Sequence, residues 1–324
     1  MQRSPFITPP LQGSLTSFID YGGDDNFGSG GEGGILFYSN SSADHAVIVS
    51  EAAPGVYSLG GLTEFNDQST AGNSQITVRG GGFSPQFGSY IYFLDSSAAG
   101  NAVITIDSAE VPLSSFASPV FDDSASAGNA TFSFKAAFAE GVYAAEGSFH
   151  NTTTADHGTF FVNGATVAHG QGCQIFFYDS STAAESTFTL NGGEGEEAGP
   201  GSIQFLGNSS AGNATITING GTNGGQGGNC FVGEKSYSGG TARFEIFGNG
   251  LLYGGGASFS LITLKRGSLT VGTVFTIISN TSATPVVGTF DNLPDGTVIT
   301  AGGNNLQASY EGGDGNDLTL TAVP

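Results

Sequence analysis

The chain has 324 residues, of which 54 are glycine, 26 are phenylalanine and 38% are hydrophobic. This composition is too apolar for a disordered chain, and 11 prolines are too few for collagen. Seven basic residues against 28 acidic ones give a formal net charge of −21. Because nucleic acids and anionic membrane surfaces are bound by cationic side chains, this charge argues against both as partners.

The first segment, residues 1–33, does not fit the pattern that follows and is expected to form an N-terminal cap. Its opening, MQRSPFITPPLQGSL, lacks the continuous apolar stretch of a signal peptide. No apolar run in the chain reaches the roughly 18 residues of a membrane-spanning helix. The sequence therefore predicts no membrane insertion, and it favours a chain excised from a longer protein.

A period of 28 residues governs residues 34–250. The alanine of each SAGNA-like turn recurs at this spacing from Ala43 to Ala211, with no insertion or deletion, and Gly239 continues the series. Six residues before each alanine stands a phenylalanine, and the ladder fails only at Gly233. Its members are Phe37, Phe65, Phe93, Phe121, Phe149, Phe177 and Phe205. Apolar and polar residues alternate around these turns, which predicts strands with one buried face.

Each unit is expected to form a strand, a tight turn, a second strand and a glycine-rich loop. One unit cannot bury its apolar face, so successive units must stack. The predicted fold is all-β: a right-handed parallel β-helix, or β-solenoid, of about eight regular coils, with the hand that parallel crossovers adopt. Residues 251–324 depart from the period and predict a C-terminal cap whose strands continue the sheet.

The corner of each coil needs a residue that accepts a positive φ. Glycine stands there in most coils, Asp44 and Asp156 replace it in two, and Ala184 is the least suitable substitute. The next position is often asparagine, whose amide is expected to hydrogen-bond along the stack. These asparagines are Asn73, Asn101, Asn129 and Asn213.

Units such as SAGNATITI, followed by the tail VGTFDNLPDGTVI and YEGGDGNDLTLT, resemble the autotransporter-associated β-strand repeat proteins. These are large exported or surface-attached bacterial proteins with β-helical passenger regions. The resemblance covers about residues 34 to 324. It implies an extracellular or bacterial cell-surface location and a structural or adhesive role, although the chain carries no recognisable signal peptide.

Two acidic features are candidates for calcium binding. One is a stack four residues before the repeated alanine, formed by Asp67, Asp95, Asp123 and Asp179. Carboxylates about 5 Å apart repel each other, so they are either solvated turn caps, the interpretation we favour, or calcium ligands. The other is GGDGND, with Asp314 and Asp317, which resembles half of a calcium-binding repeat but occurs once, so a capping turn is favoured. No other cofactor is indicated.

Histidines and cysteines give no further site. His45 and His157 occupy equivalent positions four coils apart, about 19 Å by strand spacing, so they cannot share a metal ion. Cys173 and Cys230 are two coils apart, beyond the roughly 7 Å between Cα atoms that a disulfide spans. Both are expected to be free thiols.

Because some β-helices degrade polysaccharides, a lyase or hydrolase is one alternative function. A lyase of this type uses a basic residue near an acidic cluster, but Arg79, Lys135 and Lys235 lie on different coils and are expected not to converge. A hydrolase needs paired carboxylates, but Asp24 and Asp25, like Asp122 and Asp123, are sequence neighbours in turn-like segments. Adjacent residues of a strand point to opposite faces, which would separate such a pair. No catalytic residue is assigned.

Ice binding is a second alternative, because outward threonines two residues apart on stacked strands form a regular lattice. The candidate binding face comprises Thr131, Thr159, Thr187, Thr189, Thr215 and Thr217. Phe161 interrupts it, and threonine is also simply a good exposed β-residue. The preferred hypothesis is therefore a non-catalytic extracellular scaffold or adhesin segment. Its loops would bind a glycan or another surface ligand, and its ends or faces could self-associate.

Overall fold

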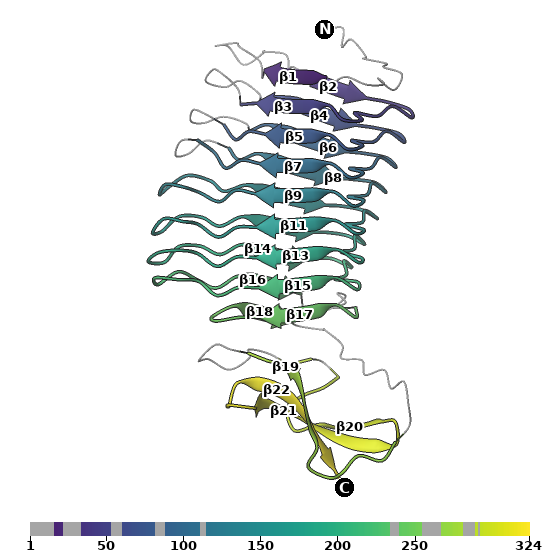
Figure 1. Cartoon of the computed structure of the whole chain (residues 1–324), viewed down its shortest axis with the longest axis vertical. Coiled ribbons are helices and arrows are strands. Elements are labelled where there is room, and N and C mark those ends of the chain that lie inside the picture. The colour runs from purple at the N-terminus through teal and green to yellow at the C-terminus, as the bar shows by residue number, and fades with distance from the viewer. Residues whose placement is uncertain are drawn as a thin grey trace.

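The computed structural model describes residues 16–21, 34–52, 60–81, 88–110, 115–233, 240–254, 267–280, 289–290 and 292–324. These residues form strands, turns and bridges; among them is no helix that could cross a membrane. Figure 1 shows the strands stacked one above another along an elongated rod, from the N-terminal to the C-terminal end. The predicted all-β solenoid is confirmed.

Two nine-stranded parallel sheets, called sheet A and sheet B, run along the rod. Sheet A contains, in order, β1 (Ser17–Tyr21), β3 (Val47–Glu51), β5 (Gln75–Val78), β7 (Val103–Ile106), β9 (Thr131–Phe134), β11 (Thr159–Val162), β13 (Thr187–Leu190), β15 (Thr215–Ile218) and β17 (Arg243–Ile246). Sheet B contains β2 (Gly34–Phe37), β4 (Leu62–Phe65), β6 (Tyr90–Phe93), β8 (Ser118–Phe121), β10 (Glu146–Phe149), β12 (Gln174–Phe177), β14 (Ser202–Phe205), β16 (Asn229–Val232) and β18 (Leu251–Gly254).

The strand register confirms the 28-residue coil and corrects it towards both ends. The step is 47 − 17 = 30 residues from β1 to β3 and 251 − 229 = 22 residues from β16 to β18. From Val47 on β3 to Arg243 on β17, each residue of a sheet A strand pairs with the residue 28 positions further on. Because there are seven such pairings in succession, the solenoid makes about seven turns. In sheet B, Phe205 pairs with Val232, a step of 232 − 205 = 27. Gly233 has no side chain to fill the interior, and the one-residue shift places valine there instead. The expectation of an unbroken period is wrong at this step.

The core consists of two columns of phenylalanine rings. Along sheet B the rings stack nearly parallel from Phe37 to Phe205, with centroids 4.5–5.1 Å apart. Along sheet A, Phe132, Phe160 and Phe188 stack in the same way at 4.8 and 4.6 Å. Edge-to-face contacts of about 6 Å join the two columns. Offset-stacked and edge-to-face geometries are the ones that aromatic quadrupoles favour.

The turn between the sheet B strand and the sheet A strand contains two left-handed residues. The predicted corner is confirmed, because glycine, aspartate and Ala184 all have φ between 50° and 64° at this position. A second positive φ, not predicted, occurs five residues earlier, in the acidic stack: Asp67, Asp95 and Asp123 each have φ 56°. Aspartate tolerates this conformation better than most residues with a side chain, so the stack occupies a second corner.

The solenoid extends beyond the boundaries expected at both ends. β1, within the expected N-terminal cap, pairs in register with β3, and β18 pairs with β16. The C-terminal residues continue sheet A only through a single parallel bridge between Ile246 and Asn280, where several strands were expected. They form a separate antiparallel sheet of β19 (Val274–Ile278), β22 (Asp317–Val323), β21 (Asn304–Gly312) and β20 (Val298–Ala301). Short turns join β20 to β21 and β21 to β22, and such connections permit only antiparallel pairing.

The two cysteines are free and buried, as expected. Cys230 faces the interior from β16, where it pairs with Ile203, and Cys173 precedes β12. Burial raises the pKa of both thiols well above the ordinary range. Both are therefore protonated and unreactive in the folded protein.

Candidate functional site

The acidic stack, formed by Asp67, Asp95, Asp123 and Asp179, binds the backbone of the neighbouring coil. The backbone N–H of Asp67 donates to the carboxylate of Asp95 (3.0 Å), and that of Asp95 donates to Asp123 (3.3 Å). Asn151, which stands in the same column, donates likewise to Asp179 (3.0 Å). Each carboxylate thus satisfies the exposed amide at the corner of the preceding coil. The sequence favoured aspartates that cap their own turns, whereas these carboxylates cap the turn of the neighbouring coil.

The calcium ligands proposed from the sequence do not come together in a multidentate site. No group of three or more histidine, cysteine, aspartate or glutamate side chains able to hold a metal lies among the described residues. Asp314 lies exposed in the turn between β21 and β22, and Asp317 is the buried first residue of β22. The Asp317 carboxylate accepts a hydrogen bond from the backbone N–H of Asn280 (2.7 Å). Calcium binding stays a prediction for both features.

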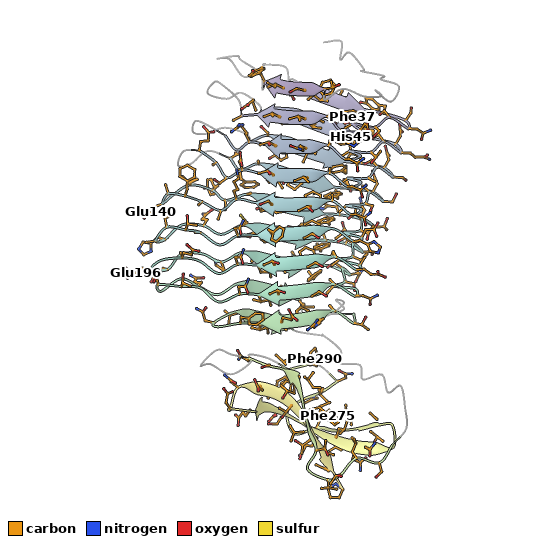
Figure 2. All side chains as sticks on the ribbon, viewed as in Figure 1. Phe37, His45, Glu140, Glu196, Phe275 and Phe290 are labelled. Carbon is orange, nitrogen blue, oxygen red and sulfur yellow. The ribbon has the colours of Figure 1, made fainter. Side chains whose placement is uncertain are left out.

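The two histidines that directly follow a corner residue lie on the surface. His45 lies 2.8 Å from the carboxylate of Asp44, and His157 lies 2.6 Å from that of Asp156 and 3.1 Å from Glu185. Figure 2 shows His45 at the turn side of the rod, opposite the loop side where Glu140 and Glu196 project. These pairs are solvent-exposed, and pairs of this kind contribute little to stability.

Asparagines that directly follow a corner residue form the predicted ladder of side-chain amides. The Asn101 side-chain amide donates to Asn73 (3.1 Å), and that of Asn129 donates to Asn101 (3.2 Å). A second ladder, not predicted, follows sheet A. There Asn191 donates to Asn163 and Asn219 donates to Asn191, both at 2.8 Å. Such ladders hold successive coils in register.

The expectation that the basic residues do not converge is wrong for Arg79 and Lys135. Both stand directly after a strand of sheet A, one coil on either side of Asp107. Lys135 Nζ lies 2.7 Å from the Asp107 carboxylate, and Arg79 Nη1 lies 3.8 Å from it. Arg79 Nε also lies 3.1 Å from Glu51 in the preceding coil. We call these four residues the charge column; Lys235 lies outside the described residues.

The threonine face lies on the outer side of sheet A as predicted. Thr131, Thr159, Thr187 and Thr215 pair in one continuous row, and Thr189 pairs with Thr217 in the neighbouring row. The side chain of Phe161 is 40% exposed in the second row and breaks the lattice there. Towards the N-terminal end the face becomes more apolar, and the side chain of Val103 is 53% exposed.

The C-terminal sheet contains an apolar pocket of about 320 Å³, open to solvent, which was not predicted. It is lined mainly by Leu269, Phe275, Ile277, Leu306 and Leu320. Figure 2 labels Phe275 in this sheet. The lining contains no ionisable side chain, so the pocket offers shape and apolar surface but no acid or base.

No family model matches the chain. No curated protein matches it either.

Proposed function

We propose that the chain is a non-catalytic, extracellular binding scaffold of the adhesin type. One observation carries this proposal: the outward side chains of both sheets are held in register, coil after coil, by ladders of parallel strands. Such a surface repeats the same chemical group at one strand spacing, about 4.8 Å. A repeating ligand or an extended surface is therefore the natural partner.

The environment of the charged side chains supports a structural use for them. The acidic stack caps backbone amides, and the charge column neutralises its own members along the rod. A general acid or base needs a pKa shifted towards the working pH at a reacting centre. In the charge column and the acidic stack, each carboxylate has a backbone amide or a basic side chain as its partner instead.

An extracellular or cell-surface location follows from the resemblance to autotransporter-associated repeat proteins and remains part of the proposal. Antibody labelling of intact and permeabilised cells tests it. Labelling of intact cells supports the location, whereas labelling that requires permeabilisation contradicts it.

Binding is tested by presenting the purified protein to immobilised glycans and extracellular proteins. We expect saturable binding to at least one of them and no chemical change of that ligand. Failure to bind any surface, or turnover of a bound ligand, would contradict the proposed function.

Ice binding is the second candidate, favoured by the continuous row of four threonines from β9 to β15. Its test is the thermal hysteresis of the purified protein, with Thr187→Tyr as the variant that would disrupt the lattice. Our proposal expects no hysteresis. Hysteresis that Thr187→Tyr abolishes would establish ice binding instead.

A polysaccharide lyase or hydrolase is the third candidate, since Arg79 and Lys135 both contact Asp107. Incubation with acidic and neutral polysaccharides, followed by chromatography of the products, tests it. Cleavage that is lost in Lys135→Ala would support the enzyme and overturn the scaffold.

A further inference from the structure

The outer face of sheet B carries a group of aromatic side chains that the core does not use. Tyr90 and Tyr92 both project outward from β6, and their ring centroids are 5.7 Å apart. Three coils further on, Phe176 on β12 and Tyr178 directly after it have centroids 5.8 Å apart with rings nearly parallel. The His150 ring stacks on that of Tyr178 at 4.8 Å.

A partly polar strip lies between the two aromatic groups. The residues that face outward from β8 and β10 between them are Val120, Glu146 and Ser148, while Ser118 is buried. Glu146 is half-buried, and burial raises the pKa of its carboxyl above the ordinary range. Burial, and secondarily the charge of Glu146, also raises the pKa of Tyr90 and Tyr178. Glu146 pairs with Gln174 at the start of β12, so its carboxyl stands on the outer face one coil before Phe176 and Tyr178.

The outward rings of sheet B contrast with the outer face of sheet A. Most outward positions of sheet A carry threonine, serine or valine, which suit an open strand surface, although Phe161 also stands there. Tyrosine instead offers a flat apolar face and a hydroxyl that reaches solvent. Tyr92 and Phe176 stand in one row of the sheet, three strand spacings or about 14 Å apart, with Val120 and Ser148 between them. Glu146 stands in the neighbouring row, two residues before Ser148 on β10. Stacking surfaces and hydrogen-bonding groups therefore lie side by side on this face.

We propose that the outer face of sheet B between β6 and β12 binds a neutral glycan chain, with the rings of Tyr90 and Tyr178 stacking on sugar faces and Glu146 accepting sugar hydroxyl hydrogen bonds. We call this surface the aromatic face; it comprises Tyr90, Tyr92, Glu146, His150, Phe176 and Tyr178. The inference rests on the proposed binding function and deepens it, since it names both the ligand class and the surface. It places recognition on a sheet face, where the sequence suggested the loops.

The charge of this region selects a neutral chain over an acidic one. Glu146 lies within the aromatic face, Asp122 borders it beside β8, and the whole chain carries a net charge of −21. A uronate or sulfated sugar would meet like charges there, which disfavours binding. A neutral sugar presents apolar C–H faces to the rings and hydroxyls to the carboxylate. An extended chain can follow the rod axis across several coils.

The test measures the affinity of the full chain for neutral hexose oligosaccharides of increasing length by isothermal titration calorimetry. The variant Tyr90→Ala/Tyr178→Ala should bind at least about fivefold more weakly, because it loses two stacking contacts. Glu146→Gln keeps the shape of the side chain and should weaken binding less. The matched control is Phe161→Ala, which removes an exposed ring from sheet A and should leave the affinity unchanged.

Three results would overturn the inference: no binding of any neutral oligosaccharide, an affinity that the double variant retains within about twofold, or tighter binding of a uronate oligosaccharide of equal length. Circular dichroism melting of each variant confirms folding. If the wild type binds a glycan and the double variant binds it equally well, only the aromatic face is wrong and the scaffold function stands. If the glycan is consumed, the scaffold function itself fails.

Discussion

The ring of Phe121 lies parallel to that of Phe149 in the next coil, with centroids 4.5 Å apart and planes inclined by 1°. Phe121 also stacks on Phe93 at 4.7 Å and meets Phe132 of the opposite sheet edge to face. Its side chain is 1% exposed. One residue therefore joins three coils and both sheets, which makes it the most informative position in the core.

Truncation of this ring should strongly destabilise the solenoid. Phe121→Ala leaves a cavity between rigid neighbours, and we expect the free energy of unfolding to fall by about 3–5 kcal/mol. Urea denaturation followed by circular dichroism measures it. Phe161→Ala, at an exposed position, serves as the control. If both variants have the same free energy of unfolding, the column of phenylalanine rings does not hold the coils together.

The corner at Ala184 should be improved by glycine. Ala184 has φ 50°, a conformation that costs a residue with a Cβ about 1–2 kcal/mol and glycine nothing. Because glycine also gains freedom in the unfolded chain, Ala184→Gly should stabilise the protein by only about 0.5–1 kcal/mol.

The neighbouring Ala183→Gly is the matched control for this corner. Ala183 is fully buried and lacks a positive φ, so the substitution should destabilise the protein. Thermal melting of the two variants compares them directly. A lower melting temperature for Ala184→Gly would contradict the corner geometry.

The acidic stack can be tested at Asp95, whose carboxylate accepts the backbone N–H of Asp67. Asp95→Ala removes this bond and leaves alanine at a positive φ, so it should cost about 1–2 kcal/mol. Asp95→Asn keeps an acceptor and tolerates the conformation, as Asn151 does in the same column, and should be nearly neutral.

Calcium distinguishes the capping role from a metal site at the same residues. A cation bound only by the folded protein would raise the melting temperature with its concentration. If the carboxylates act as turn caps alone, melting curves in calcium and in EDTA should coincide. A calcium-dependent rise that Asp95→Asn abolishes would instead assign a structural calcium site to the stack.

The N-terminal end of the solenoid should become more stable as the pH is lowered. Asp20 is buried on β1 and accepts the backbone N–H of Leu62 at 2.6 Å, and burial raises the pKa of its carboxyl from 3.8 to about 6. The folded state therefore prefers the protonated carboxyl. Its contribution to stability is fully present below pH 3.8 and is lost as the pH rises through about 6.

Hydrogen exchange of the amides of β3 and β4 should follow this titration. We expect protection to fall between about pH 5 and pH 7, after correction for the intrinsic exchange rate, in the wild type but not in Asp20→Asn. An identical pH dependence in both proteins would show that Asp20 does not control this edge.

The repeat was predictable because the core places one residue type at one spacing. Phe37 begins a column that is visible in the sequence, and the corner substitutes Asp44 and Ala184 occupy the places expected of them. The charge column was missed because it alternates in sign: Glu51, Arg79, Asp107 and Lys135 share a position but not a residue type. Opposite charges stabilise adjacent coils where like charges would repel.

Features outside the period were less predictable. The shift that brings Val232 into the core is compensated within the same coil, so the spacing of the turns conceals it. The aromatic face was missed because Tyr90 and Phe176 occupy outward positions, where the period places no constraint on residue type. In the C-terminal sheet, tight turns rather than a repeating core set the antiparallel pairing, and strand patterns alone do not give its direction.

The central claim is that this solenoid binds an extended ligand and leaves it chemically unchanged. The most direct measurement is a glycan-binding isotherm on the full chain, followed by prolonged incubation and mass spectrometry of the recovered ligand. We predict saturable binding of a neutral glycan chain and recovery of that chain at its original length. Shortened or unsaturated products, or the absence of saturable binding, would contradict the account.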